Sequence, residues 1–438
     1  MDSLVKPFFK LSETINCPIC KESIVLYDAP RSKFTTCSYC FSYLQIISSE
    51  LSKLNKELKK PEKTPVLKLG SVANIHENEF KVVAYLEKRE VGTIYCWREY
   101  ILTSQSKGYV TLSEFDGHWN LIGGEKFVPN FKTPISYGVS VGYNDVEYTI
   151  FNKYSPIVTS MLGELDWDVV NEKVNATDYI APPYMVVKEI TGTTNLSTDY
   201  YIGEYLEPQV IANIFNIDLS LLPEKVGVGA NQPSKEYDRW TSSLKITGIA
   251  IVLVLLLHLL FGIIKPNKEL VNSDFLIAYD PKTGGDSFKS FITPSFYIDD
   301  ESSNIEFEIA SAVDNNWLET TIVLVNEGDN RTWEVSKGIE FYHGYEDGER
   351  WSEGSTKETI LLSEIPRGKY HLNVYPSSGD VYRNNLYIKA TSNVTMWRNT
   401  LLTILLLCIY PAICWYLMRK FEKGRWNNSD YSPFVNED

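Results

Sequence analysis

Four cysteines near the start of the chain have the spacing of a metal site. Cys17 and Cys20 form one Cys-x-x-Cys pair, and Cys37 and Cys40 form a second pair, separated from the first by sixteen residues. Each pair can present two thiolates from one tight turn, and four thiolates close a tetrahedral zinc site. Such a site leaves no position for water or substrate. We therefore predict a structural zinc ion in a ribbon over residues 1–45, with redox chemistry or a labile cluster as the alternative.

The hairpin between the two cysteine pairs carries almost no net charge. Its charged residues are Lys21, Arg31 and Lys33 against Glu22 and Asp28. A surplus of one positive charge gives little attraction to phosphates, so nucleic acid is disfavoured as a partner. Contact with protein is the better interpretation of this ribbon.

Apolar residues recur at helical spacing directly after the ribbon. Ile47, Leu51, Leu54 and Leu58 are separated by four, three and four residues, and Pro61 follows them. This periodicity predicts a linker helix over 46–61. The helix would either pair with a partner or dock on its own domain.

Carboxylates and aromatic residues in the following segment are candidates for a ligand or partner site. They are Glu164, Asp166, Trp167, Asp178, Glu189 and Glu204. Carboxylates can perform acid–base chemistry or bind cations, but their spacing does not distinguish that role from turn formation and helix capping. The chain contains no phosphate-binding glycine loop, no nucleophile elbow and no dinucleotide fingerprint. We therefore predict no catalytic residue.

Residues 66–216 show short alternating runs of apolar and polar residues, separated by glycine and polar turns. This pattern is typical of antiparallel strands. The distinctive motifs are LKLGSVANIHENEFKVVAYL, WREYIL, FDGHW, GELDW, DYIAPP and YIGEYLEPQVIANIF. On these motifs the segment resembles the bacterial family known as domain of unknown function 4178. The resemblance implies a β-rich cytoplasmic domain that follows a cysteine ribbon. It also implies a gene located in clusters for envelope stress or membrane maintenance. It implies no reaction.

Two apolar segments, 246–264 and 398–418, are long enough to cross a membrane as helices. Lys and Arg are concentrated directly after the second segment, in the tail 419–438, and such residues gather on cytoplasmic flanks. The linker 217–245 before the first segment is also basic at its end. The first residues show no apolar run with a cleavage site, so we expect no removable signal peptide. Both termini are therefore expected in the cytoplasm, in a two-span protein of the inner membrane.

His258 lies within the first apolar segment. An ionisable side chain inside a membrane helix is a candidate functional group, for example a relay or an intramembrane polar site. The alternative is a neutral imidazole that only forms a hydrogen bond between two helices.

The segment between the spans, 267–395, is expected outside the cytoplasm. Its strand-like runs alternate apolar and polar residues and predict an antiparallel β-sandwich. Residues 266–395 contain 11 Lys and Arg against 22 Asp and Glu, a net charge of -11, which disfavours nucleic acid and favours solubility or a cationic partner. Tyr345 and Trp351 lie in a polar, acidic loop. This loop is a candidate site, outside the cytoplasm, for binding a sugar, a cation or a protein. The alternative is an ordinary solvated hairpin.

Together these features predict a mainly β, multidomain membrane protein. Our first hypothesis is a non-enzymatic scaffold or sensor that joins a zinc ribbon and β-rich domain in the cytoplasm to an outer β-sandwich. It would contact the lipid bilayer and protein partners on the cytoplasmic side, with further partners outside or a second copy of itself. The competing hypothesis is a membrane-tethered enzyme or ligand-binding regulator that uses the carboxylates of residues 66–216.

Overall fold

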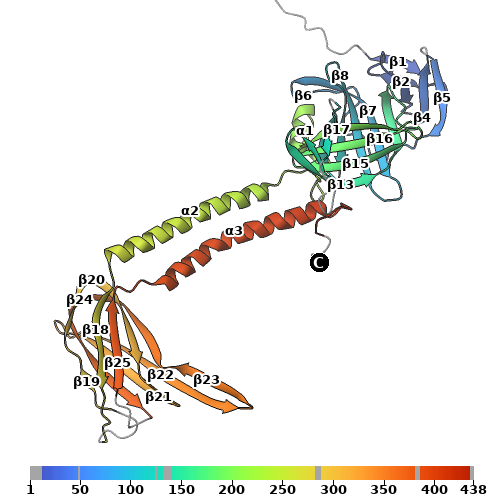
Figure 1. Cartoon of the computed structure of the whole chain (residues 1–438). Coiled ribbons are helices and arrows are strands. Elements are labelled where there is room, and N and C mark those ends of the chain that lie inside the picture. Colours follow the sequence, from blue (N-terminus) through green and yellow to red (C-terminus); the bar gives the residue numbers. More distant parts are fainter. Residues whose placement is uncertain are drawn as a thin grey trace, which may run out of the picture. The chain divides into compact units, whose positions relative to one another are not determined.

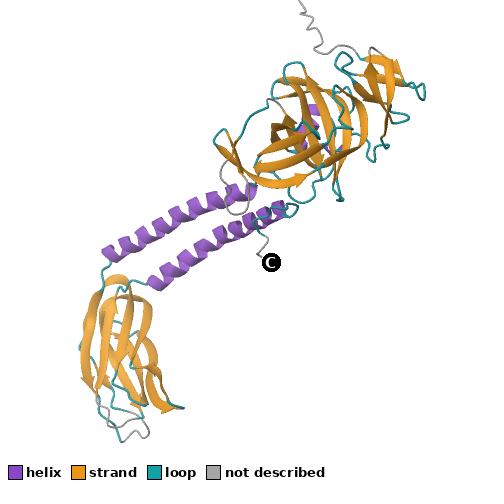
Figure 2. Cartoon of the chain, turned by 45° about the vertical axis from the view of Figure 1, so that its right-hand side comes forward, coloured by secondary structure: helices purple, strands orange, loops and turns teal. Residues whose placement is uncertain are grey.

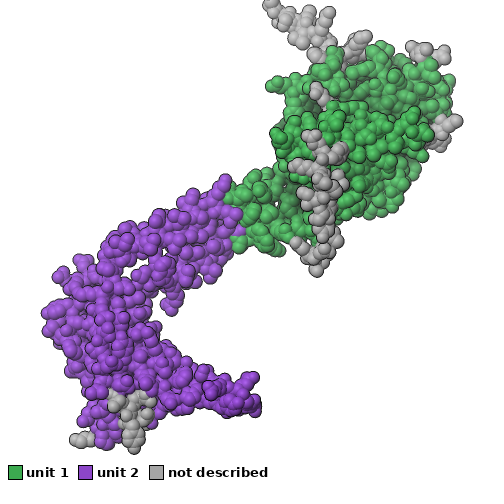
Figure 3. All heavy atoms as spheres, viewed as in Figure 1, with its two compact units in different colours: residues 1–242, 412–438 green, residues 243–411 purple. Residues whose placement is uncertain are grey.

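The computed structural model describes residues 12–47, 50–123, 126–131, 140–281, 288–379 and 385–434. The chain divides into two compact units, one made of residues 1–242 with 412–438 and the other of residues 243–411 (Figure 3). Strands dominate both units, and two long helices are shared between them. The prediction of a mainly β protein with a cysteine cluster and two apolar helices is confirmed at this level.

Five short strands form the described part of the ribbon. They are β1 (Glu13–Asn16), β2 (Ser23–Leu26), β3 (Phe34–Thr36), β4 (Ser42–Ile47) and β5 (Glu50–Glu57). β1 and β2 pair with each other alone, whereas β3, β4 and β5 continue the large sheet of the same unit. The ribbon is therefore joined to the β-rich domain by backbone hydrogen bonds. Residues 1–11 of the predicted ribbon lie outside the described residues.

The linker helix predicted over 46–61 is wrong, because β4 covers residues 46–47, β5 covers residues 50–57, and the two strands pair antiparallel. Leu51 packs in the small core of the ribbon with Ile46, whereas Leu54 packs in a core of the β-rich domain. A spacing of three residues puts two side chains on one face of a helix but on opposite faces of a strand. Two apolar environments, one on each side, therefore favour the strand.

The β-rich domain contains strands β6 to β17 and one helix, α1 (Pro208–Phe215) (Figures 1 and 2). The strands are β6 (Val72–Ile75), β7 (Asn78–Glu90), β8 (Cys96–Ser104), β9 (Gly108–Phe115), β10 (His118–Gly123), β11 (Asn130–Phe131), β12 (Ser140–Tyr143), β13 (Val146–Tyr154), β14 (Pro156–Leu165), β15 (Val174–Ala181), β16 (Tyr184–Thr191) and β17 (Ser197–Leu206). Their order is β11-β12-β13-β15-β16-β17-β10-β9-β8-β7-β14-β3-β4-β5, with β6 on β7.

This sheet curls strongly. Five strands lie between β13 and β8 in the sheet order, yet Trp97 of β8 packs edge-on against Tyr154 of β13, with ring centroids 5.5 Å apart. Strands so far apart in a flat sheet could not touch, because neighbouring strands are about 4.8 Å apart. The concave side is apolar at one end, around Leu86, Ile101 and Met161. On the other side of the sheet, Tyr85, Tyr100 and Trp119 form a second core with α1.

The second unit carries strands β18 to β25. They are β18 (Lys268–Leu276), β19 (Phe291–Ile292), β20 (Phe296–Ala310), β21 (Asn316–Asn326), β22 (Thr332–Glu346), β23 (Glu349–Ser355), β24 (Lys357–Ser378) and β25 (Asn385–Ser392). The predicted sandwich is, in its hydrogen bonding, one eight-stranded antiparallel sheet over the described residues. The reason is β24, which runs on for 22 residues and pairs first with β20 and then with β21. One core, including Phe307, Ile322 and Leu372, fills the domain.

Two helices, α2 (Lys235–Ile264) and α3 (Trp397–Trp426), are long and apolar enough to cross a membrane. In their apolar windows 0% of the α2 residues and 11% of the α3 residues are buried. A core helix of a soluble protein would hide much of this surface. The helices exceed the predicted segments 246–264 and 398–418, because polar turns extend each of them on the side of the first unit.

Candidate metal centre and buried polar groups

The four ribbon cysteines come together as predicted. Their sulfur atoms all lie within 4.8 Å of one another, with Cys17 Sγ 3.8 Å from Cys40 Sγ and Cys20 Sγ 3.5 Å from Cys37 Sγ. Four thiolates at the usual Zn–S length of about 2.3 Å are separated by about 3.8 Å in a tetrahedron. The donor set and its spacing therefore fit a zinc ion.

Two matching turns position these thiols. Lys21 N–H donates to the carbonyl of Cys17 at 3.0 Å, and Phe41 N–H donates to that of Cys37 at 2.9 Å. Lys21 and Phe41 both have positive φ, at 68° and 56°. Each turn thus reverses the chain directly after its second cysteine, which presents both sulfur atoms on one side. The repeated Cys-x-x-Cys spacing is the sequence pattern behind this geometry.

The hairpin between the cysteine pairs is held by Glu164 of β14. Its Oε1 accepts hydrogen bonds from the backbone N–H groups of Tyr27 and of Asp28, the latter at 2.6 Å. Lys81 of β7 donates to the Tyr27 carbonyl at 3.1 Å. Gly70 leaves room for the Tyr27 ring, because a Cβ at this position would lie 2.4 Å from it. The ribbon is therefore seated on its own domain by a buried carboxylate.

Glu164 is only 1% exposed, and burial raises the pKa of its carboxyl to about 7. Asp28 raises this pKa further, whereas the two backbone N–H groups and Lys81 lower it. An acid whose pKa is higher in the folded than in the unfolded chain holds its proton more tightly when folded. Its contribution to stability is therefore complete below about pH 4.5 and is lost as the pH rises through about 7.

Glu164→Gln is expected to remove this pH dependence. Both hydrogen bonds from the ribbon reach one oxygen, so the amide carbonyl of Gln can accept them without an ionisation step. Between pH 5 and pH 7.5 the wild-type protein should lose up to about 3 kcal/mol of stability relative to the variant. Thermal unfolding of both proteins across this pH range measures the difference.

The matched control is Glu77→Gln, which neutralises an exposed carboxylate in the same domain. It should follow the wild-type pH profile. Parallel profiles for wild type and Glu164→Gln would show that Glu164 does not titrate in this window.

A second group of polar side chains, half-buried apart from the buried Glu99, lies in the concave part of the sheet. Lys88 Nζ is 2.7 Å from Glu99 Oε2, and Trp97 Nε1 donates to Glu99 Oε1 at 2.8 Å. Tyr154 donates through its hydroxyl to Asp178 Oδ1 at 3.3 Å. These side chains come from strands β7, β8, β13 and β15, so the curl of the sheet brings them together.

The predicted residues Asp178 and Glu189 belong to this polar group. Glu189 is paired in register with Ala176, two residues before Asp178, so both carboxylates lie on the same face of neighbouring strands. Burial raises the pKa of Asp178 to about 7, and burial also raises the pKa of Glu189, although Lys88 lowers it. One half-buried lysine thus lies close to several acids.

The other predicted carboxylates lie elsewhere. Asp166 and Trp167 follow β14, where the Trp167 ring packs edge-on against Tyr109 at 5.1 Å. Glu204 of β17 forms an ion pair with His76 at 2.9 Å. The six residues therefore occupy four places and do not form one site. Lys88 and Glu99 were missed, although a charged residue at an inward position of an otherwise apolar strand could have indicated them.

The end of α3 is anchored to the first unit by Arg425, which is 2% exposed. Its guanidinium donates to the carbonyls of Gly229 (3.1 Å), Ala230 (2.8 Å) and Gln232 (2.7 Å), directly before α2. We call Arg425 and these three carbonyls the tail clamp. From sequence, Arg425 counted only as one of several basic residues of the tail.

The residues after the tail clamp also bind the β-rich domain. Trp426 packs on Phe151 with ring centroids 5.3 Å apart, and the Ser429 hydroxyl donates to the Phe151 carbonyl at 2.5 Å. Tyr431 packs against the core around Tyr148. A cavity of about 370 Å³, lined in part by Pro182 and Tyr237, lies beside this contact. The tail is therefore a structural part of the domain.

His258 forms a hydrogen bond between two helices, which was the alternative to a functional role for this residue. Its Nδ1 is 2.7 Å from the Thr400 hydroxyl of α3, and its ring lies 4.2 Å from that of Trp397. The imidazole thus joins α2 to α3 within the second unit. Nε2 of His258 is buried without a partner among the described residues.

Tyr345 and Trp351 are not in a loop. They lie on β22 and β23, which form a long hairpin with its turn at Asp347 and Gly348. Tyr345 is 71% exposed and Trp351 is 44% exposed. The Trp351 ring covers Gly344 on the opposite strand, where a Cβ would lie 2.8 Å from the ring. Each residue points to a different face of the hairpin.

No protein-family model matches the chain, and no curated protein matches it. Among solved structures, one of the infectious bursal disease virus Gt strain has 10% sequence identity and a TM-score of 0.18, covering 83% of this chain and 67% of that chain. The VP2 subviral particle of infectious bursal disease virus has the same identity and TM-score, with 83% and 65% coverage. Similarity at this TM-score carries no argument about function.

Proposed function

We propose that the chain is a non-enzymatic scaffold or sensor of the inner membrane, with a zinc ribbon and β-rich domain in the cytoplasm and the β18–β25 domain outside. The observation that carries this proposal is that the two apolar helices are connected to each other inside each unit. The tail clamp holds the end of α3 to the residues before α2. His258 and Thr400 join the same helices in the second unit.

The outer domain adds a further connection between the helices. β18 follows α2 and β25 precedes α3, and the two strands pair so that Lys268 lies opposite Ser392. A shift of one helix along the other would strain this pairing and the tail clamp. Strands and buried hydrogen bonds resist such strain, so the helix pair would pass a change in one domain to the other.

The proposal includes membership of the domain of unknown function 4178 family. The motif resemblance over 66–216 supports it, as do the cysteine ribbon in front and the tail that packs on the domain. Zinc is the proposed metal, because a closed set of four thiolates suits this ion. Protein partners would bind the cytoplasmic face, and a second copy of the chain is one such partner.

The second candidate is a tethered enzyme or ligand-binding regulator. The observation in its favour is the polar group around Lys88, where Asp178 has a pKa of about 7, a value suited to proton transfer at neutral pH. Against it, Glu99 is bonded to Lys88 and Trp97, and Asp178 to Tyr154, so these groups satisfy one another. We therefore favour the scaffold or sensor.

The topology can be tested with a membrane-impermeant maleimide, because Cys96 of the first unit is exposed and residues 97–407 contain no cysteine. In intact cells the reagent should label a Thr332→Cys variant but not the wild-type protein. After permeabilisation the wild-type protein should be labelled at Cys96, with Cys96→Ser as the control. Labelling of Cys96 in intact cells, without labelling of the cysteine introduced by Thr332→Cys, would contradict the proposed orientation.

A further inference from the structure

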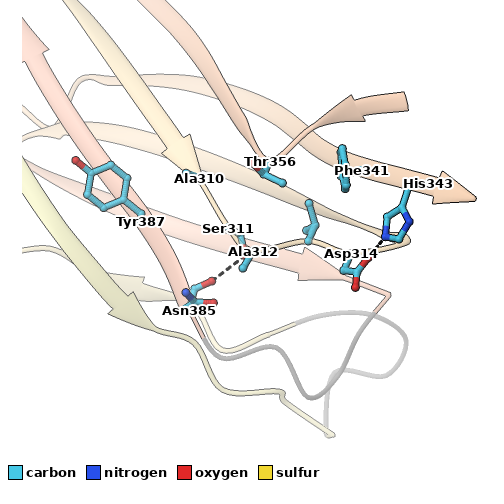
Figure 4. A pocket seen from close by; sticks show the side chains of 10 residues that line it. Ala310, Ser311, Ala312, Asp314, Phe341, His343, Thr356, Asn385 and Tyr387 are labelled. Atoms are coloured by element: carbon cyan, nitrogen blue, oxygen red, sulfur yellow. Dashed lines mark hydrogen bonds and ion pairs between the residues drawn. The ribbon is translucent and has the colours of Figure 1, made fainter. Parts of the chain in front are cut away.

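A cleft of about 550 Å³ lies in the second unit at the base of the β22–β23 hairpin (Figure 4). Its volume is in the range of small-molecule sites, roughly 300–1,000 Å³. Its wall combines apolar side chains, among them Val313 and Phe341, with hydrogen-bonding groups.

The polar groups of the cleft are a carboxylate, an imidazole, an amide and a hydroxyl. Asp314 Oδ1 is 2.7 Å from His343 Nε2, and Asn315 accepts the backbone N–H of His343 at 2.8 Å, so the imidazole is held in place (Figure 4). Asn385 and Thr356 add an amide and a hydroxyl, and neither side chain has a hydrogen bond within the described residues.

A row of rings leads out of the cleft along one face of the hairpin. Phe341, His343 and Tyr345 alternate on β22, so their side chains share a face with a spacing of about 6–7 Å. The Phe341 and His343 rings are 5.7 Å apart. Opposite Phe341, β23 presents Gly354, whose φ of +88° and close approach to the Glu340 carbonyl exclude a side chain. The surface beside the first ring is therefore open.

We propose that this cleft and ring row bind a linear, uncharged oligosaccharide. Sugar rings have one apolar C–H face, which packs on aromatic rings, and an edge of hydroxyls that both donate and accept. The carboxylate, amide and hydroxyl of the cleft match such an edge. Residues 266–395 carry a net charge of -11, which disfavours an anionic ligand. On the hairpin itself, Glu340, Glu346 and Glu349 lie on the face opposite the rings, and Arg350 lies opposite Tyr345 on the ring face.

A basic peptide is the competing ligand, but the cleft suits it less. The Asp314 carboxylate is already paired with His343, so it is a weaker cation site than a free acid. Gly354 leaves the backbone beside Phe341 without a side chain, a flat surface that suits the face of a sugar ring. A peptide would also leave the row of rings largely unused.

The test uses the full chain in a zwitterionic detergent without a sugar head group, which would compete. Isothermal titration with tetrasaccharides of N-acetylglucosamine and of glucose should show one saturable site per chain for one of them. Asp314→Asn and Tyr345→Ala should each weaken binding about tenfold, the loss of one good contact. Tyr297→Ala removes another exposed tyrosine, on β20, and should bind as the wild type does.

Absence of binding of both sugars, unchanged affinity in both cleft variants, or saturable binding of an arginine-rich decapeptide in their place would overturn the proposal. Circular dichroism of each variant shows that the fold is retained. This inference rests on the proposed function, since it names the ligand of the outer domain, but the two can fail separately. A negative titration leaves the maleimide result unchanged, and a reversed topology leaves the titration unchanged.

Discussion

Replacement of Cys17 and Cys20 by serine is expected to abolish zinc binding and to unfold the ribbon. Structural zinc sites supply roughly 10–16 kcal/mol of apparent binding energy, and the ribbon core, with Ile24, Leu26 and Leu44, is too small to replace it. Unfolding of the ribbon should also destabilise the β-rich domain, because β3 pairs with β14 and Glu164 of β14 binds the ribbon hairpin. The measured zinc content should fall from one ion per chain to none, and amide hydrogen exchange should accelerate in β3 and β14.

The control is Cys96→Ser, since Cys96 is exposed and lies outside the cluster. It should leave zinc content and exchange unchanged. Wild-type protein without zinc, or with the absorbance of an iron–sulfur cluster, would contradict the metal assignment. Normal exchange in β14 of the double variant would contradict the docking.

Arg425→Ala is expected to release the tail from the β-rich domain. The substitution removes the donors of three buried carbonyls and of Glu422, at a cost of about 3 kcal/mol or more. Residues 225–234 and 426–431 should become sensitive to limited proteolysis, and the melting temperature of the first unit should fall. Arg425→Lys keeps the charge but not the planar fork, so it should restore only part of this stability.

Lys420→Ala is the matched control, because Lys420 is an exposed basic residue of the same helix. It should behave as the wild type does. Equal protease sensitivity of Arg425→Ala and Lys420→Ala would mean that the tail clamp does not hold the tail.

Local patterns in the sequence predicted local structure well. The spacing of Cys17, Cys20, Cys37 and Cys40 sets the geometry of two turns, and the apolar runs of α2 and α3 need no tertiary context to be recognised. The segment around Leu51 and Leu54 was predicted as a helix because its spacing fits one. Its true conformation depends on two cores that the segment itself does not encode.

The buried polar contacts could not be predicted, because each joins residues far apart in the sequence. Glu164 binds a hairpin 136 residues earlier, and Arg425 binds carbonyls nearly 200 residues earlier. Basic residues are also expected beside a membrane span on its cytoplasmic side. Arg425 fitted that expectation, so its structural role could not be recognised from the sequence. Likewise Asp178 and Glu189 acquired Lys88 and Glu99 as neighbours only through the curl of the sheet.

The central claim is that the helix pair connects the two domains, and hydrogen–deuterium exchange of the full chain in lipid nanodiscs tests it most directly. His258→Leu removes the bond to Thr400 in the second unit and touches no residue of the first. Faster exchange is expected in residues 225–234 and 426–431, around the tail clamp, as well as near the substitution. Faster exchange confined to residues 243–264 and 397–411 would contradict it.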